Sequence, residues 1–319
     1  MKQLAGCESL WTHRLAMMTV GATLLLILAG GVVTETGSGM AVPDWPTTFG
    51  YNMFLFPWAK MTRGILYEHS HRLIGSVVGL LTLILAIGLW AIDQRRWVRW
   101  LGVAALGAVV IQGVLGGLRV ILVAEQLALL HGILAHAFLA LAASLALFTS
   151  RRWRGQATVL PDRRAERLRS WSLFVTATTY LQIVLGAVVT HNRGGLAFHV
   201  GVAMLLSVMV PLLTQRVCSR LSVWPELVRP AKWLRLSWIL QMILGLGSYV
   251  MIFGGSQMPA SALLALVFPV LHRLGAGLVL VVSLVLTLQV FRVSRHAHAG
   301  YESRSNGEAG AGVTSKAVS

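Results

Sequence analysis

Residues 73–92 read LIGSVVGLLTLILAIGLWAI, twenty consecutive residues without a charge. A helix that crosses the hydrocarbon core of a bilayer needs about 20 apolar residues. Including this stretch, the chain of 319 residues has eight such spans, at residues 15–34, 73–92, 101–118, 127–150, 170–190, 196–215, 236–255 and 274–291. Their apolar residues do not alternate, and an open sheet cannot satisfy its backbone in lipid. The sequence therefore predicts an all-α integral membrane protein with eight transmembrane helices.

Composition and charge agree with a membrane location. The chain is 56% hydrophobic and 12% charged, and its mean hydropathy is +0.71, which excludes an ordinary soluble domain. Most of the 27 basic residues fall before the first span or after spans two, four, six and eight. This positive-inside pattern predicts cytoplasmic termini, in a bacterial cell membrane or, if the source is eukaryotic, the inner mitochondrial membrane. The net charge of +16 thus orients the protein and attracts anionic lipid, and we expect no nucleic-acid partner.

The chain divides into two sets of four spans. We expect an N-terminal half at 1–150, a charged cytoplasmic linker at 151–170, a C-terminal half at 171–293 and a disordered tail at 294–319. Short phrases recur between the halves: Gln-x-x-Leu-Gly begins at Gln112, Gln182 and Gln241, and Val-Val-Thr ends at Thr34 and Thr190. Four spans return the chain to the same side, so the halves are predicted to be pseudo-repeated four-helix bundles related by an axis along the membrane normal.

Two further features allow more than one interpretation. The Gln-x-x-Leu-Gly phrase is interpreted as a helix contact, with Gln bonded across helices, in preference to a catalytic Gln. The outer loop 35–70 is rich in Gly, Pro and aromatic residues. It is predicted to be either an interfacial aromatic belt or a lid over a pocket.

Four histidines stand at the outer ends of the even-numbered spans: His71, His131, His199 and His272. Histidine is costly in lipid and usually marks a function there. Two histidines on different helices can bind a haem iron from opposite sides. We predict that His71 pairs with His131, and that His199 pairs with His272. A packing or interfacial role is the alternative for any one of them, but the fourfold pattern favours iron ligation.

Other residues of the sequence are weaker candidates for iron ligation. His136 competes with His131, but it lies five residues further along, about 140° around a helix, so both cannot face one iron. The depth of His131 matches that of His199, which favours His131. His69 points elsewhere than His71. The two cysteines, Cys7 and Cys218, offer no CxxCH phrase for covalent haem attachment, and no disulfide is expected.

Charged residues accompany the histidines. Arg72 and Arg273 directly follow two of them, and guanidinium groups suit the carboxylates of haem propionates. The alternative is an arginine that extends to the interface. Glu68 lies one turn before His71, where it is either a helix-dipole partner or a group that relays protons. Pro269 takes the corresponding place in the second half. This asymmetry assigns chemistry to the first half and a supporting redox role to the second.

The chain resembles the haem A synthase family (COX15/CtaA-type membrane proteins), which convert haem O to haem A. The resemblance runs from about residue 15 to 291, and each phrase is specific only in this order and spacing. The matching phrases are Thr34-Glu-Thr-Gly-Ser-Gly39, Pro43-Asp-Trp-Pro46, Glu68-His-Ser-His-Arg72, Gln112-Gly-Val-Leu-Gly-Gly117, His131-Gly132, Gln182-Ile-Val-Leu-Gly-Ala187, His199 and His272-Arg273.

The resemblance implies a reaction and a division of labour. A porphyrin methyl group would be oxidised to formyl by successive hydroxylation, which yields a cofactor for terminal oxidases. By position, His199 and His272 would hold a resident haem b. His71 and His131 would face the substrate haem O, and Glu68 would be the essential carboxylate. Implied partners are a haem O synthase, an electron-transfer protein and membrane lipid; an oligomer is compatible with the sequence.

One departure and one alternative remain. Many bacterial members of the family have a cysteine pair in the first outer loop, where this chain has Val42 and Thr48. The chain thus resembles the subfamily without that pair. A bis-histidine cytochrome for electron transfer, or a haem carrier or sensor, would share the four histidines but would not need Glu68. A solute transporter is not expected, because the sequence lacks paired helix interruptions at mid-bilayer.

Overall fold

The computed structural model describes residues 2–155, 162–192, 194–254 and 261–311, with side chains at 10–155, 166–191, 194–254 and 261–294. Its elements are α1 (Lys2–Glu35), η1 (Met53–Leu55), η2 (Trp58–Lys60), α2 (Arg63–Ile92), α3 (Arg96–Ile121), α4 (Glu125–Thr149), α5 (Arg151–Arg154), α6 (Asp162–Asn192), α7 (Leu196–Arg220), α8 (Pro225–Phe253) and α9 (Ala262–Ala311). Eight helices in the described residues are long and apolar enough to cross a membrane. The predicted multi-span helical fold is confirmed.

Several helices begin well before the apolar spans predicted for them, and α2 and α9 are the two of these that carry site histidines. α2 starts at Arg63, although its apolar span starts at residue 73, and α9 starts at Ala262 with Pro269 inside it. The early turns of α2 contain the charged residues Arg63, Glu68 and Arg72, which interrupt a span defined by hydropathy. Those of α9 are apolar but contain Pro269, which is unfavourable in a helix interior. α9 also continues to Ala311, through most of the segment for which the sequence predicted disorder. Residues 312–319 lie outside the described residues.

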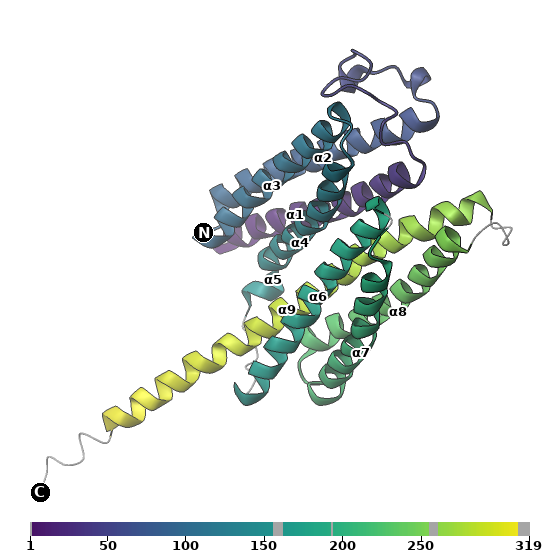
Figure 1. Ribbon diagram of the computed structural model, residues 1–319. Coiled ribbons are helices and arrows are strands. Elements are labelled where there is room, and N and C mark those ends of the chain that lie inside the picture. Colours follow the sequence, from purple (N-terminus) through teal and green to yellow (C-terminus); the bar gives the residue numbers. More distant parts are fainter. Residues whose placement is uncertain (1, 156–161, 193, 255–260, 312–319) are drawn as a thin grey trace, which may run out of the picture.

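The helices form two groups that lie side by side, α1–α4 and α6–α9 (Figure 1). α9 packs against α1 and α4, and α4 also packs against α6. The segment between α1 and α2 lies at one end of the bundle, and the C-terminal part of α9 extends from the other end (Figure 1). The loop that follows α1 is therefore placed over the ends of the N-terminal group, on the side of the molecule where the four histidines lie.

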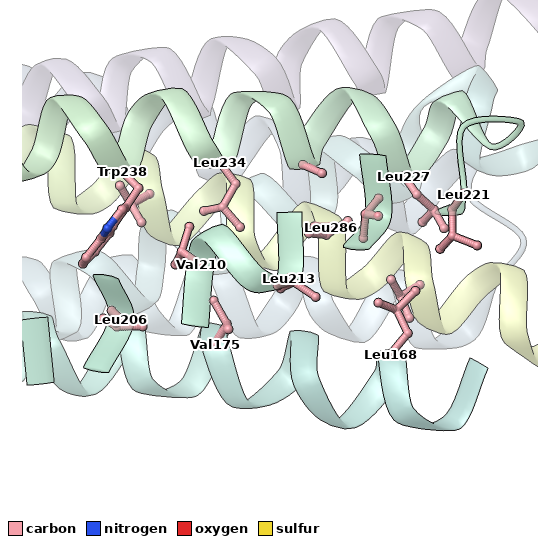
Figure 2. Packing of buried hydrophobic residues seen from close by; sticks show 14 of the residues in the cluster. Leu168, Val175, Leu206, Val210, Leu213, Leu221, Leu227, Leu234, Trp238 and Leu286 are labelled. Atoms are coloured by element: carbon pink, nitrogen blue, oxygen red, sulfur yellow. The ribbon is translucent and has the colours of Figure 1, made fainter. Parts of the chain in front are cut away.

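Each group of helices has a core of its own. Figure 2 shows the core of α6–α9, where leucines and valines from all four helices interdigitate. This core includes Leu168, Val175, Leu206, Val210, Leu213, Leu227, Leu234, Trp238 and Leu286. The core of α1–α4 includes Leu15, Val78, Leu85, Leu89, Val98, Phe138 and Leu145. In lipid, close packing of this kind stabilises helix association through van der Waals contact. The repeat relation between the two groups stays a prediction.

Glycines allow the two groups to approach each other. A β-carbon on Gly31 of α1 would lie 3.3 Å from the Val270 side chain of α9. A β-carbon on Gly277 of α9 would lie 3.0 Å from Leu139 of α4. Small residues at such crossings let helix backbones come close in a membrane. The contact between the groups thus runs along the helices that carry His131 and His272.

Candidate functional site

The four predicted histidines meet as two pairs. The ring centroids of His71 on α2 and His131 on α4 are 6.4 Å apart, with an interplanar angle of 75°. Those of His199 on α7 and His272 on α9 are 6.3 Å apart, with an angle of 79°. Each pair therefore brings together two different helices of the same group, in the combination that the sequence predicted.

The separation within each pair fits a metal ion between the rings. An imidazole nitrogen binds a metal at about 2 Å, and the ring centre lies roughly 1 Å behind it, so two rings on opposite sides of one metal have centroids about 6 Å apart. Both observed separations agree with this value. The residues present thus fit a bis-histidine haem iron, although iron ligation itself stays a prediction.

A glycine lies behind each of the four imidazoles, on the helix that precedes it in the chain. A β-carbon on Gly30 would lie 3.0 Å from Cε1 of His71, and one on Gly245 would lie 2.9 Å from Cε1 of His272. The corresponding distances are 3.3 Å between Gly116 and His131, and 3.1 Å between Gly186 and His199. The rings come this close only because these positions have no side chain.

Glu68 and Arg72 of α2 bind the outer loop, which in the structure comprises residues 36–62. Glu68 lies one helical turn before His71, and Arg72 directly follows it. The Glu68 carboxylate, 3% exposed, accepts hydrogen bonds from the Val42 N–H at 2.8 Å and from Arg72 at 2.9 Å. Arg72 also donates to the carbonyl oxygens of Val42, Asp44 and Thr47. Four contacts to protein thus occupy Arg72. Binding of a propionate by Arg72 stays a prediction.

Further contacts hold the loop against the helices. The Thr48 hydroxyl lies 3.1 Å from Nδ1 of His69, so His69 faces the loop and not the His71 pair. The Trp45 indole lies so close to Gly117 of α3 that a β-carbon there would be 2.3 Å from the ring. Val42 and Thr48 are both fully buried. The loop is therefore tied to α2 and α3 by hydrogen bonds and aromatic packing.

Asp44 organises the loop itself. Its carboxylate accepts hydrogen bonds from the N–H groups of Phe49 and Gly50, at 2.7 and 2.9 Å, and from the Thr47 hydroxyl. Partial burial opposes ionisation of Asp44, but the hydrogen bonds from Gly50, Thr47 and Phe49 outweigh it, and the pKa lies below its usual value of 3.8. Asp44 is thus a charged turn-forming residue.

Arg119 belongs to this region, although sequence reasoning missed it. Its guanidinium donates to the Gly39 carbonyl at 2.9 Å, and its charge acts on Glu68 and on the imidazoles of His71 and His131. A single arginine near the end of a span gave no signal in the sequence beyond that of an interfacial residue. The structure makes it part of the first site.

Arg273 lies between the two groups of helices. Its guanidinium donates to the Glu35 carboxylate at 2.5 Å, and to the Gly31 carbonyl and the Thr190 hydroxyl at 3.4 Å each. Glu35 ends α1, so this ion pair joins the residue after His272 to the helix that packs on His71. Sequence reasoning did not identify Glu35 as its partner. Binding of a propionate by Arg273 also stays a prediction.

The structure places His131, and not His136, opposite His71. Nδ1 of His136 lies 2.9 Å from the carbonyl of Gly132 in its own helix, and the ring packs against Gly277 of α9. His136 is buried between the two groups of helices.

Comparison with known proteins identifies the family. Residues 13–309 match the family model of the cytochrome oxidase assembly proteins, COX15-CtaA. The chain belongs to this family. As a member of it, the protein combines the family's helical membrane fold with two facing histidine pairs.

Several bacterial relatives carry the name Heme A synthase. The chain is 30% identical to one from Shouchella clausii (strain KSM-K16) over 190 residues, and 31% identical to one from Geobacillus kaustophilus (strain HTA426) over 189 residues. It is 33% identical to one from Lysinibacillus sphaericus (strain C3-41) over 183 residues. These matches cover 56–58% of this chain and 57–60% of the relatives. The chain thus matches somewhat over half the length of each relative.

Proposed function

We propose that this protein is a haem A synthase that converts haem O to haem A for assembly of a terminal oxidase. The proposal rests on two histidine pairs, each at the separation of imidazoles that share one iron, in a member of the COX15-CtaA family. The relatives named Heme A synthase support it.

The two sites take different roles in this proposal. His199 and His272 would hold a resident haem b, whose iron supplies electron transfer when it is bound. His71 and His131 would bind the substrate haem O. If water rather than molecular oxygen supplies the oxygen atom, oxidation of its methyl group to formyl releases four electrons and four protons. An electron-transfer partner would take the electrons, and a haem O synthase would deliver the substrate.

Glu68 is the residue that we assign to proton transfer. It is buried one turn from His71, and its carboxylate is kept in place by the Arg72 guanidinium and the Val42 N–H. A buried carboxylate next to the substrate ligand can accept the protons that oxidation releases. Arg119, which binds the Gly39 carbonyl in this region, would favour a propionate nearby.

The test is a substitution that keeps the size of the side chain. Glu68→Gln should reduce formation of haem A by at least about 100-fold, because general acid–base groups typically contribute that much. The resident haem should remain bound. Haems extracted from membranes that contain a source of haem O are identified by mass. Glu125→Gln is the control, because Glu125 is an exposed carboxylate at the start of α4 on the same side. Unchanged formation of haem A in Glu68→Gln would show that Glu68 is not needed for proton transfer.

The second candidate is a bis-histidine cytochrome that transfers electrons without altering haem. The observation in its favour is that the two histidine pairs have nearly the same geometry, as two permanent ligand sets would have. The same extraction separates the candidates. A formyl-bearing haem supports the synthase, and only unaltered haem supports the cytochrome.

A further inference from the structure

Four positions before each of the four glycines, on the same helix and the same face of it, lies a residue that could reach the same histidine. These residues are Leu26, Gln112, Gln182 and Gln241, on the helices whose glycines contact His71, His131, His199 and His272 respectively. The four positions are thus equivalent in the sequence and differ in the side chain that they carry.

Two of the four side chains, those of Gln182 and Gln241, donate hydrogen bonds to the histidine of the following helix. Nε2 of Gln182 donates to the main-chain carbonyl of His199 at 2.9 Å and lies 3.2 Å from Nε2 of its ring. Nε2 of Gln241 donates to the main-chain carbonyl of His272 at 3.0 Å and lies 3.0 Å from Nδ1 of its ring. The bond to the carbonyl is common to both. Each histidine of the second pair is therefore attached to the preceding helix by a buried amide.

The first pair lacks this attachment. Nε2 of Gln112 is buried and has no hydrogen-bond partner among the described residues. Leu26 has no side-chain donor at all. His131 and His71 are thus held by their own helices and by the glycine contacts, whereas each of His199 and His272 also accepts a hydrogen bond from a glutamine amide.

We propose that Gln182 and Gln241 are positioning residues that retain the haem of the second site, and that the absence of such bonds in the first site permits its haem to exchange. This inference rests on the proposed function, because a substrate must enter and a product must leave one site only. Groups that orient the ligands of a metal typically change its affinity 10–100-fold. The bond to the main-chain carbonyl fixes the place of the histidine, and each amide lies against only one ring nitrogen, so the other nitrogen, Nδ1 of His199 or Nε2 of His272, is the one that would bind iron.

The experiment replaces each amide by a side chain of similar length without donors. Gln182→Met and Gln241→Met should each speed the transfer of haem from the purified full-length protein to apomyoglobin by about tenfold or more. The reduced-minus-oxidised absorption spectrum and the midpoint potential of the retained haem should also change, which loss of packing alone would not produce. Gln112→Met is the matched control and should transfer the resident haem at the wild-type rate.

A second variant adds the missing bond. Leu26→Gln should slow transfer of haem from the first site, after the protein has been loaded with added haem, by about tenfold. Wild-type transfer rates in both Gln182→Met and Gln241→Met would overturn the inference, and so would an equal acceleration in Gln112→Met. Wild-type protein without a bis-histidine haem spectrum would instead overturn the proposed function, so the two failures are distinguishable.

Discussion

At the scale of single residues, the site depends on four glycines as much as on the four imidazoles, because a side chain at any of these glycines would press on a ring. Every ligand candidate packs with Cε1 towards a glycine, at distances where a real β-carbon would press on the ring. An imidazole ring is rigid, so a displaced ring takes its metal-binding nitrogen with it. Bis-histidine coordination tolerates little displacement, because both nitrogens must lie on one axis through the iron.

Gly245→Ala should therefore lower the haem content of the purified protein. The new methyl group would start 2.9 Å from Cε1 of His272 and force the ring away. Gly201→Ala on α7 is the control, since nothing lies within 4 Å of its β-carbon position. In a helix interior, Ala is more favourable than Gly by about 0.5–1 kcal/mol, so the control should be as stable as wild type or more so. The ratio of Soret to protein absorbance measures haem content. Equal ratios in both variants would show that the ring tolerates the methyl group.

Single site residues could be predicted where the residue type is unusual for its surroundings in the sequence. A histidine in an apolar span is conspicuous, so the four histidines and their pairing could be predicted from sequence. The Gln-x-x-Leu-Gly phrase was predicted to bond across helices, which is confirmed for Gln182 and Gln241 but not for Gln112. Arg119 and the Glu35–Arg273 pair were missed, because these contacts join segments far apart in the sequence and only packing brings them together.

At the scale of elements, α2 has two functions on two faces. Glu68, His69 and Arg72 bind the outer loop, while His71 turns towards α4. These contacts allow α2 to extend beyond its apolar span, because loop groups rather than water bind Glu68, His69 and Arg72. The sequence left open whether the loop is a belt or a lid. The contacts to Glu68 and Arg72 show a segment fixed over the first histidine pair, with Phe54, Leu55 and Trp58 exposed on its outer side.

The loop should loosen in acid because of Asp44. A carboxyl group whose pKa is lowered by folding contributes stability above its unfolded pKa and loses it as the pH falls through the folded pKa. For Asp44 the contribution is present above its ordinary value of 3.8 and is lost below it. The N–H groups of Phe49 and Gly50 donate hydrogen bonds to the Asp44 carboxylate. Their hydrogen exchange, corrected for the intrinsic rate at each pH, should therefore accelerate below that pH. Asp44→Asn should abolish this pH dependence. A pH-independent protection factor in the wild type would contradict the assignment.

At the scale of the whole molecule, two groups of helices with separate cores meet through α1, α4, α6 and α9. The Val-Val-Thr phrase that recurs in the two groups makes the same hydrogen bond in each. The Thr34 hydroxyl donates to the Gly30 carbonyl at 2.9 Å, and the Thr190 hydroxyl donates to the Gly186 carbonyl at 3.0 Å. The number of spans could be predicted because hydropathy measures length and polarity. The choice of neighbours could not, because lipid is as apolar as the helices and only shape decides which faces meet.

The charges that flank the helices predict the orientation in the membrane, and with it the side on which the histidines lie. The turn between α2 and α3 contains Arg95 and is followed by Arg96 and Arg99, whereas residues 122–124, between α3 and α4, carry no charge. The positive-inside rule therefore predicts that the first turn lies in the cytoplasm and the second outside, together with the outer loop and both histidine pairs. Alkaline phosphatase is active only outside the cytoplasm, and green fluorescent protein exported in unfolded form does not fluoresce there. Fusions after Gln94 should therefore fluoresce and lack phosphatase activity, and fusions after Val123 should show the opposite. The reverse result at both positions would contradict this orientation and put both histidine pairs on the cytoplasmic side.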